Sequence, residues 1–177
     1  MDEVALKDGR TLAIRRAGPA DAEAMLDYLH AVGGESDNLL FGSEGVPYAV
    51  EQEREMLQKL SEAKTSAMFL GILDGRIVSV VNVNAPTRPR IAHTCEIGVS
   101  VRKECWNLGV GSAMMDRLVR FARSTGILEV IHLSVRSDNL HAIRLYERTG
   151  FVKIGTYEKY MKVDGRSHDV LLMNLYL

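Results

Sequence analysis

The amino-acid sequence predicts a mixed α/β fold built on one sheet that is partly antiparallel and partly parallel. The antiparallel part is indicated by residues 66–101, where three β-prone runs follow one another and Asp74-Gly75 supplies the positive φ angles of a tight hairpin turn. The parallel part is indicated by residues 109–149, where helical and strand patterns alternate. The predicted order of elements is therefore β-α-α-β-β-β-α-β-α-β-β.

The elements before the hairpin are assigned from periodicity and from turn residues. Pro19 suits the first turn of a helix, and Gly33-Gly34 is a stop signal for it. A stretch rich in Gly, Ser, Asn and Asp follows, and renewed helical spacing then indicates a second helix. We expect a strand at 10–17, a helix at 18–34, a loop at 33–48 and a helix at 48–64.

The elements after the hairpin alternate before the chain closes. Gly150 is placed to terminate a helix, and Asp164-Gly165 is placed at the turn of a closing hairpin. We expect a third antiparallel strand at 91–101, a helix at 109–124, a strand at 127–135, a helix at 139–149 and hairpin strands at 151–163 and 166–177.

Length and composition indicate a single domain, residues 1–177, in the cytoplasm. A net charge of -1 with a pI near 6.5 gives no field that would attract nucleic acid or a membrane surface. No apolar run approaches the roughly 20 residues needed to span a bilayer, and the first residues lack an apolar signal core. Cys95 and Cys105 are the only cysteines, so a reducing compartment is expected rather than a disulfide framework.

The stretch WNLGVGS, residues 106–112, stands at a strand-to-helix junction. The first amides of a helix have no partner within it, and with the helix dipole they form an anion site. Gly109 and Gly111 lack Cβ atoms, so a phosphate can lie against this backbone. The alternative is a tight turn without a ligand. Neither G-x-G-x-x-G nor the P-loop G-K-[ST] is present, because residue 114 is Met, so a standard nucleotide site is not predicted.

A second motif lies further along the chain, in LSVRSDNLHAIRLYERTGF. Taken singly, Asn139 has the character of a helix cap and Tyr146 that of a packed helix residue. The two motifs together form a longer pattern. It consists of V-x-x-x-x-W-x-x-G-x-G, a helix, a strand, and then N-x-x-A-x-x-x-Y-E-x-x-G-F.

This pattern resembles the GNAT superfamily of N-acetyltransferases, which transfer an acetyl group from acetyl-CoA to an amine. The resemblance covers nearly the whole chain and implies a mixed, mostly antiparallel sheet of about seven strands flanked by about four helices. It implies acetyl-CoA as cosubstrate, no metal, and a small-molecule primary amine (an amino acid, a polyamine or similar) as acceptor. The alternatives are acetylation of protein N-termini or lysines, and a CoA-binding regulatory module without turnover. Trp106 departs from the Arg or Gln that is commonest at this position.

The resemblance also assigns cofactor contacts. The end of the third antiparallel strand would offer backbone groups to the pantetheine and the thioester carbonyl, and the glycine loop would bind the pyrophosphate. Asn139 would hydrogen-bond to the cofactor near its pantetheine. Tyr146 would stand near the sulfur as general acid, because a phenol with an unperturbed pKa of about 10 stays protonated. The strand and loop residues are Val99, Ser100, Val101, Asn107, Leu108, Gly109, Val110, Gly111 and Ser112.

Glu96 is the predicted general base. An alkyl ammonium has a pKa of about 10 and must lose a proton before it attacks. Alternation places Glu96 on one strand face with Gly98 and Ser100, although an exposed or ion-paired glutamate is an equal alternative. A water relay is also plausible, because Ser134 stands where some relatives carry a catalytic carboxylate. Direct attack needs no acyl-enzyme, so the cysteines are expected to be structural, and the scattered histidines predict no metal site.

The acceptor site is expected beside the first two helices and the loop between them. Residues 31–53 contain carboxylates but no Lys or Arg, which predicts either an acidic wall for a cationic amine or a solvated surface. The carboxylates are Glu35, Asp37, Glu44, Glu51 and Glu53. A basic cluster near the glycine loop is interpreted as attraction for CoA phosphates; its members are Arg88, Arg90, Arg102 and Lys103.

The terminal strand, DVLLMNLYL, has apolar residues on both faces. As a long apolar edge strand it would need to be covered. The chain's own sheet and helices can provide the cover. The resemblance favours the other possibility, a homodimer in which the closing hairpins of two copies pack about a twofold axis.

Overall fold

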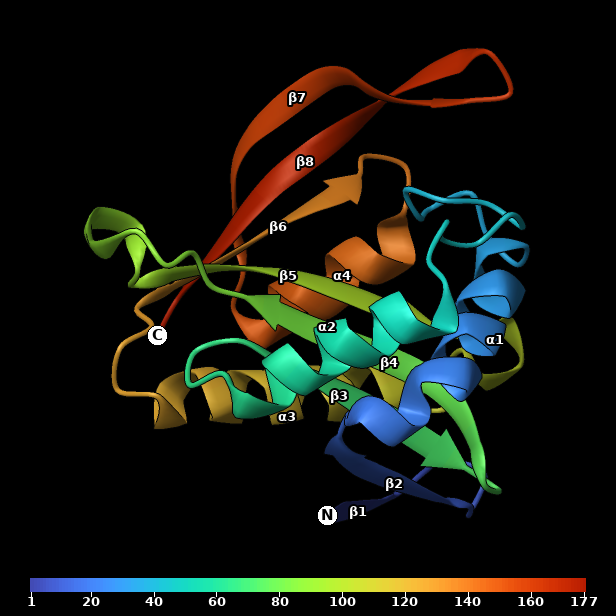
Figure 1. Ribbon diagram of the computed structural model, residues 1–177. Helices are drawn as coiled ribbons and strands as arrows, with labels where there is room; N and C mark the ends of the chain where they lie inside the picture. The colour runs from blue at the N-terminus through green and yellow to red at the C-terminus, as the bar shows by residue number, and fades with distance from the viewer.

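The computed structural model describes residues 1–177 and contains one eight-stranded sheet. Helices α1 (Ala22–Gly33) and α2 (Val50–Glu62) cover one face, and α3 (Val110–Ser124) and α4 (Leu140–Thr149) cover the other (Figure 1). The strands are β1 (Asp2–Ala5), β2 (Thr11–Arg16), β3 (Ala67–Leu73), β4 (Arg76–Asn84), β5 (Thr94–Val101), β6 (Val130–Arg136), β7 (Val152–Val163) and β8 (Arg166–Tyr176). The predicted mixed α/β class is confirmed.

The strands lie in the order β1-β2-β3-β4-β5-β6-β8-β7. Every neighbouring pair is antiparallel except β5 and β6, which are parallel. The two predicted hairpin turns are confirmed in their backbone angles. Asp74 and Gly75 have φ angles of 51° and 78°, and Asp164 and Gly165 have φ angles of 47° and 77°, as the tight turns require.

One strand was not predicted, and several elements begin later than predicted: α1 at Ala22, β5 at Thr94 and β6 at Val130. Strand β1 was not predicted, because its four residues DEVA are acidic and too few to show a period; pairing with β2, with Val4 opposite Leu12, holds it in the sheet. Strand β6 begins at Val130 rather than at residue 127. The amides of Ile127 and Leu128 bond to the side chain of Thr125, so these residues form a turn instead.

The prediction that the terminal strand is the sheet edge is wrong. Strand β8 lies between β6 and β7 and pairs with both, and β7 is the edge. One face of β8 packs into the core beneath α3 and α4 through Leu171, Met173 and Leu175, whereas the other face carries the buried Val170 and the exposed Tyr176. The paired strands β7 and β8 extend away from the body of the molecule at the top of the view (Figure 1).

The core forms two layers, one on each face of the sheet. The larger layer lies between the sheet and helices α3 and α4, and includes Met114, Leu118 and Ile143. The smaller layer lies under α1 and α2, and includes Met25 and Leu57. None of the helices is both long enough and apolar enough to cross a bilayer.

Candidate active site

The sheet opens between β5 and β6. These parallel strands share only three register pairs, from Thr94 opposite Val130 to Glu96 opposite His132. Beyond that point β5 remains paired with β4 and β6 with β8, so the two strands separate. A cavity of about 970 Å³ lies at their C-terminal ends, lined by residues of both strands and of the turns that follow them. The cavity is within the size range of small-molecule and cofactor sites.

The glycine loop forms one side of this cavity. Gly109 is the N-terminal cap of α3 with a φ of 98°, and Asn107 also has a positive φ, of 63°. Open space surrounds the missing Cβ of Gly109. The first amides of α3 therefore face the cavity without intrahelical partners, which is the geometry of an anion site. Among the predicted loop residues, Asn107, Gly109, Gly111 and Ser112 line the cavity, whereas Leu108 and Val110 pack into the core.

The end of β5 presents main-chain groups to the cavity. The amide of Arg102 donates to the carbonyl of Val78, and Ser100 lies opposite Val80, so the peptide groups of the even-numbered residues face β4. Those of Val99 and Val101 consequently face the opening. Val99, Ser100 and Val101 all line the cavity, as predicted.

Trp106, the residue that departs from the commoner loop sequence, also lines the cavity. Its indole Nε1 donates to the carbonyl of Val101 at 2.8 Å. This hydrogen bond ties the glycine loop back to the end of β5. Three main-chain groups that point into the opening therefore remain for a ligand in this part of β5: the amide of Val101 and both the amide and the carbonyl of Val99.

The second motif forms the opposite side. The Asn139 side-chain oxygen accepts a hydrogen bond from the Ala142 amide at 3.2 Å, so the capping interpretation is confirmed for that oxygen. The Asn139 side-chain nitrogen remains to donate to a ligand, and the residue lines the cavity. Tyr146 lines the cavity as well but is only 8% exposed, and burial raises its pKa to about 12. Its ring packs against Phe151 with centroids 5.8 Å apart.

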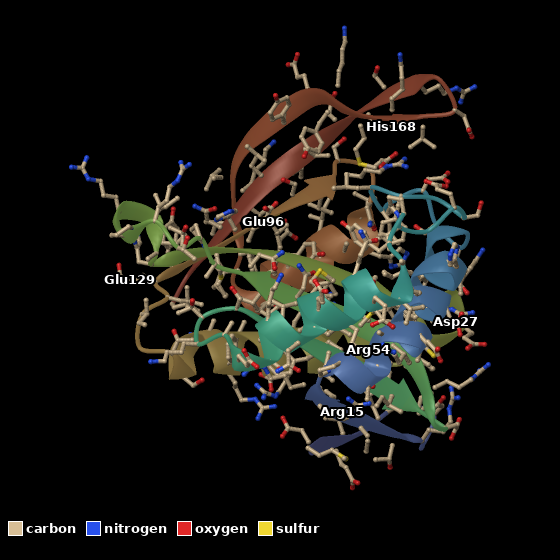
Figure 2. The ribbon with its side chains drawn as sticks, in the orientation of Figure 1. Arg15, Asp27, Arg54, Glu96, Glu129 and His168 are labelled. Carbon is tan, nitrogen blue, oxygen red and sulfur yellow. The ribbon has the colours of Figure 1, made fainter.

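Glu96 lies apart from these groups. It is exposed, it stands in register with Asn84 and His132 where β5 and β6 are still paired, and it does not line the cavity. Figure 2 shows it toward the end of β5 that is remote from α1. Strand alternation places Glu96 on the same face of β5 as Gly98 and Ser100. On that face, a Cβ on Gly98 would meet the Asn82 side chain, and Ser100 Oγ accepts a hydrogen bond from the Tyr28 hydroxyl at 2.8 Å.

Of the two alternatives for residues 31–53, the structure fits the solvated surface: Asp37, Glu44 and Glu51 are exposed, and none of the five carboxylates lines the cavity. Glu35 pairs with Arg102 at 2.7 Å, Glu51 pairs with Arg54, and Glu44 accepts from the amide of Gly42. Glu53 is completely buried. Composition alone could not reveal that neighbours engage these carboxylates. The segment does flank the cavity, but through uncharged residues: Val32, Ser36, Asn38 and Leu39.

Glu53 is a buried acid without a partner, because neither carboxyl oxygen has a hydrogen bond. Burial raises its pKa. A folded-state pKa above the unfolded value means that stability falls as pH rises above the unfolded pKa of about 4.3. We expect Glu53→Met to raise the free energy of unfolding at pH 7.5 by about 1–3 kcal/mol, with a smaller gain at pH 4, as measured by denaturant titration. Glu55→Met, an exposed position on the same helix, should show neither change, and an equal gain at both pH values would contradict the argument.

The positive charges at the cavity are not those predicted. Arg88 and Arg90 lie in the connection between β4 and β5, at the end of β5 remote from the glycine loop, and Arg102 is paired with Glu35. Four other basic residues line the cavity instead, contributed by the β1–β2 turn, by the end of β6 and by α4. They are Lys7, Arg136, Arg144 and Arg148. Sequence reasoning missed them because they belong to three separate segments.

Both cysteines are buried and free. Burial raises the pKa of Cys95 to about 11 and also raises that of Cys105. A thiol with such a pKa is not a nucleophile at neutral pH, because the thiolate is the reactive form. A pair of structural cysteines agrees with a reaction that needs no acyl-enzyme.

Comparison with known proteins identifies the family to which this chain belongs. The sequence profile of the Acetyltransferase (GNAT) family matches residues 37–151. The chain belongs to this family and is an acyltransferase that uses acetyl-CoA. The predicted GNAT resemblance is confirmed.

Individual relatives agree with the assignment. The GNAT-family acetyltransferase of Streptococcus pneumoniae is 30% identical with a TM-score of 0.92, over 94% of this chain and 99% of the other. The L-amino acid N-acetyltransferase AaaT of Escherichia coli is 28% identical over 116 residues, which is 66% of this chain and 72% of AaaT. YncA of Salmonella typhimurium, solved with its cofactor acetyl-CoA, shares the fold with a TM-score of 0.81 at 20% identity over 94% of each chain.

Proposed function

We propose that this chain transfers the acetyl group of acetyl-CoA to the primary amine of a small molecule. The observation that carries the proposal is the opening between β5 and β6. The amides that begin α3, the inward peptide groups of Val99 and Val101, and Tyr146 converge on one cavity there. A long acyl carrier fits this arrangement, with its pyrophosphate at the glycine loop and its amide-bearing arm along β5.

The reaction needs few groups. Acetyl-CoA supplies an activated acetyl thioester. A neutral amine attacks the acyl carbonyl, so that a C–N bond forms and the C–S bond breaks. The proton of the amine passes to a base, and the sulfur gains one proton. Tyr146 is the proposed proton donor, since its raised pKa keeps the phenol protonated at neutral pH.

Glu96 is the proposed base, and it acts through water. Glu96 precedes Val99 by three positions on β5, which corresponds to about 10 Å between their Cα atoms. Because Glu96 does not line the cavity, direct contact with an amine bound near Val99 is not expected. Water would carry the proton along the face of β5 that Gly98 shares, beside the Asn82 side chain.

The small-molecule acceptor is supported by the similarity to AaaT, which acts on amino acids and matches over most of its own length. Protein N-terminal or lysine acetylation is one alternative, and a CoA-binding regulatory module without turnover is the other. A single experiment distinguishes these. The purified chain is incubated with acetyl-CoA and panels of amino acids, polyamines and amine-bearing peptides, and free CoA is measured. Release with small amines supports the proposal, and release only with peptides contradicts it. Binding of acetyl-CoA with no release would identify the regulatory module.

We also propose that the chain forms a homodimer through the β7–β8 hairpin. The exposed edge strand β7 carries Val152, Ile154, Tyr157 and Tyr160, each about half exposed. An apolar edge of this length calls for a partner strand or a covering surface. Light scattering at micromolar concentration should give about twice 19.7 kDa, and Ile154→Lys should reduce the mass to that of one chain. A wild-type mass of 19.7 kDa would reject the dimer.

A further inference from the structure

The segment that follows α1, residues 35–39, contributes to the wall of the cavity, and we call it the acceptor wall. Ser36, Asn38 and Leu39 line the cavity. Glu35 and Asp37 do not line the cavity: Glu35 contacts Arg102 after β5, and Asp37 contacts Arg136 at the end of β6. The wall thus has a lining side and an anchoring side. It lies beside the C-terminal end of β6, at the right of the view (Figure 1).

The first anchor connects the wall to β5. Glu35 accepts a hydrogen bond from Arg102 Nε at 2.7 Å through one carboxylate oxygen, and from the Lys103 amide at 2.6 Å through the other. Both side chains are largely buried, with 24% of Arg102 and 21% of Glu35 exposed. A charge-assisted pair in such surroundings is screened less than a surface pair. Arg102 and Lys103 immediately follow β5 and lead into the glycine loop.

The second anchor connects the wall to β6. Arg136 Nη1 donates to the Asp37 carbonyl at 2.9 Å. The other two guanidinium nitrogens are held by Asp138 at 2.9 and 2.6 Å, and only 11% of the Arg136 side chain is exposed. Arg136 ends β6 and leads into the turn that carries Asn139. The wall is therefore fastened to both sides of the opening in the sheet, on either side of Ser36.

These contacts connect the acceptor wall, beside which the amine is proposed to bind, to the turns after β5 and β6. The turns that provide the anchors are the same turns that are proposed to hold acetyl-CoA. We propose that Glu35 is a positioning residue for the amine acceptor: through Arg102 and the Lys103 amide, it fixes the acceptor wall relative to the glycine loop. The proposal rests on the proposed function, because it assigns the wall to the amine. Glu35 touches no substrate in this scheme and acts only through residues 36–39.

The test is Glu35→Gln, which keeps the shape and removes the charge. We expect KM for the amine found in the screen to rise about tenfold, the loss appropriate to one charge-assisted hydrogen bond. The turnover number at saturating amine and the acetyl-CoA affinity measured by calorimetry should stay within about twofold. Glu44→Gln is the matched control, because Glu44 is a carboxylate of the same loop that bonds only to Gly42 within that loop.

A double variant sharpens the assignment. If Glu35 acts through Arg102, then Glu35→Gln combined with Arg102→Gln should raise the amine KM no further than the larger single effect. Additive effects would overturn the proposal. An unchanged amine KM in Glu35→Gln would also overturn it, and so would parallel losses of turnover, acetyl-CoA affinity and melting temperature, since those indicate a merely structural role.

Hydrogen exchange separates this inference from the proposed function. If the wild-type chain acetylates no amine, the proposed function fails, whereas the anchoring can still be measured. With acetyl-CoA present, the amides of residues 35–39 should exchange about tenfold faster in Glu35→Gln than in the wild type or in Glu44→Gln. Equal exchange in the three proteins would show that Glu35 does not hold the wall.

Discussion

Replacement of Tyr146 by phenylalanine should lower turnover by about 10²–10⁴-fold, the range typical for loss of a general acid. Acetyl-CoA affinity should change by less than about threefold, because the ring that packs against Phe151 is retained. Tyr146 lines the cavity, so the substitution removes a hydroxyl that a ligand bound there can use. Steady-state release of CoA and calorimetry with acetyl-CoA measure the two quantities.

The control is Tyr176→Phe, which removes an exposed hydroxyl from β8 outside the cavity and should leave turnover unchanged. The pH profile gives an independent check. Since burial raises the pKa of Tyr146 to about 12, the rate should increase as the amine loses its proton and should show no fall from tyrosine ionisation up to pH 10. Equal activity of Tyr146→Phe and the wild type would show that the thiolate leaves without this donor.

Replacement of Gly111 by valine should weaken acetyl-CoA binding by about 10–100-fold, which corresponds to the loss of one or two charge-assisted hydrogen bonds to phosphate. Gly111 lies in the first turn of α3 and lines the cavity. A Cβ at this position would lie 3.1 Å from Leu145 Cδ2, so a valine would crowd α4 and extend into the space proposed for the pyrophosphate. Calorimetric titration with acetyl-CoA measures the effect.

Gly155→Val is the matched control for this substitution. Gly155 lies on β7 away from the cavity, its φ is not positive, and a Cβ there would make an ordinary contact of 3.7 Å with Leu172. Gly155→Val should therefore keep wild-type affinity. Thermal melting establishes that both variants fold. A folded Gly111→Val protein with unchanged affinity would remove the glycine loop as the pyrophosphate site.

Much of the fold could be predicted because its signals are local. Gly150 adopts a φ of 103° and ends α4, as the sequence indicated, since only glycine adopts this conformation without strain. The Asp-Gly turns were found for the same reason. The glycine loop and the Asn139–Tyr146 motif could be found because each requires particular residues at fixed spacing along one stretch of chain.

The features that sequence reasoning missed depend on contacts between distant segments. Whether β7 or β8 pairs with β6 is decided by how the chain crosses after α4, and neither strand encodes that choice alone. The fate of the acidic segment was equally hidden, because Glu35 finds Arg102 across the fold and Glu53 turns into the core. The distance of Glu96 from the cavity follows from where β5 and β6 separate, which no spacing within β5 reveals.

The short ladder between β5 and β6 also bears on how long the protein survives in a cell. Beyond Glu96 and His132, the sheet has two internal edges whose main-chain groups are not bonded to each other. A cosubstrate that fills this opening binds the folded chain and not the unfolded one. At a concentration 100 times its Kd, such a ligand adds about 2.7 kcal/mol to the free energy of unfolding. When acetyl-CoA is scarce, more of the chain is unfolded and open to proteases. The amount of this protein should therefore follow the supply of its own acetyl donor.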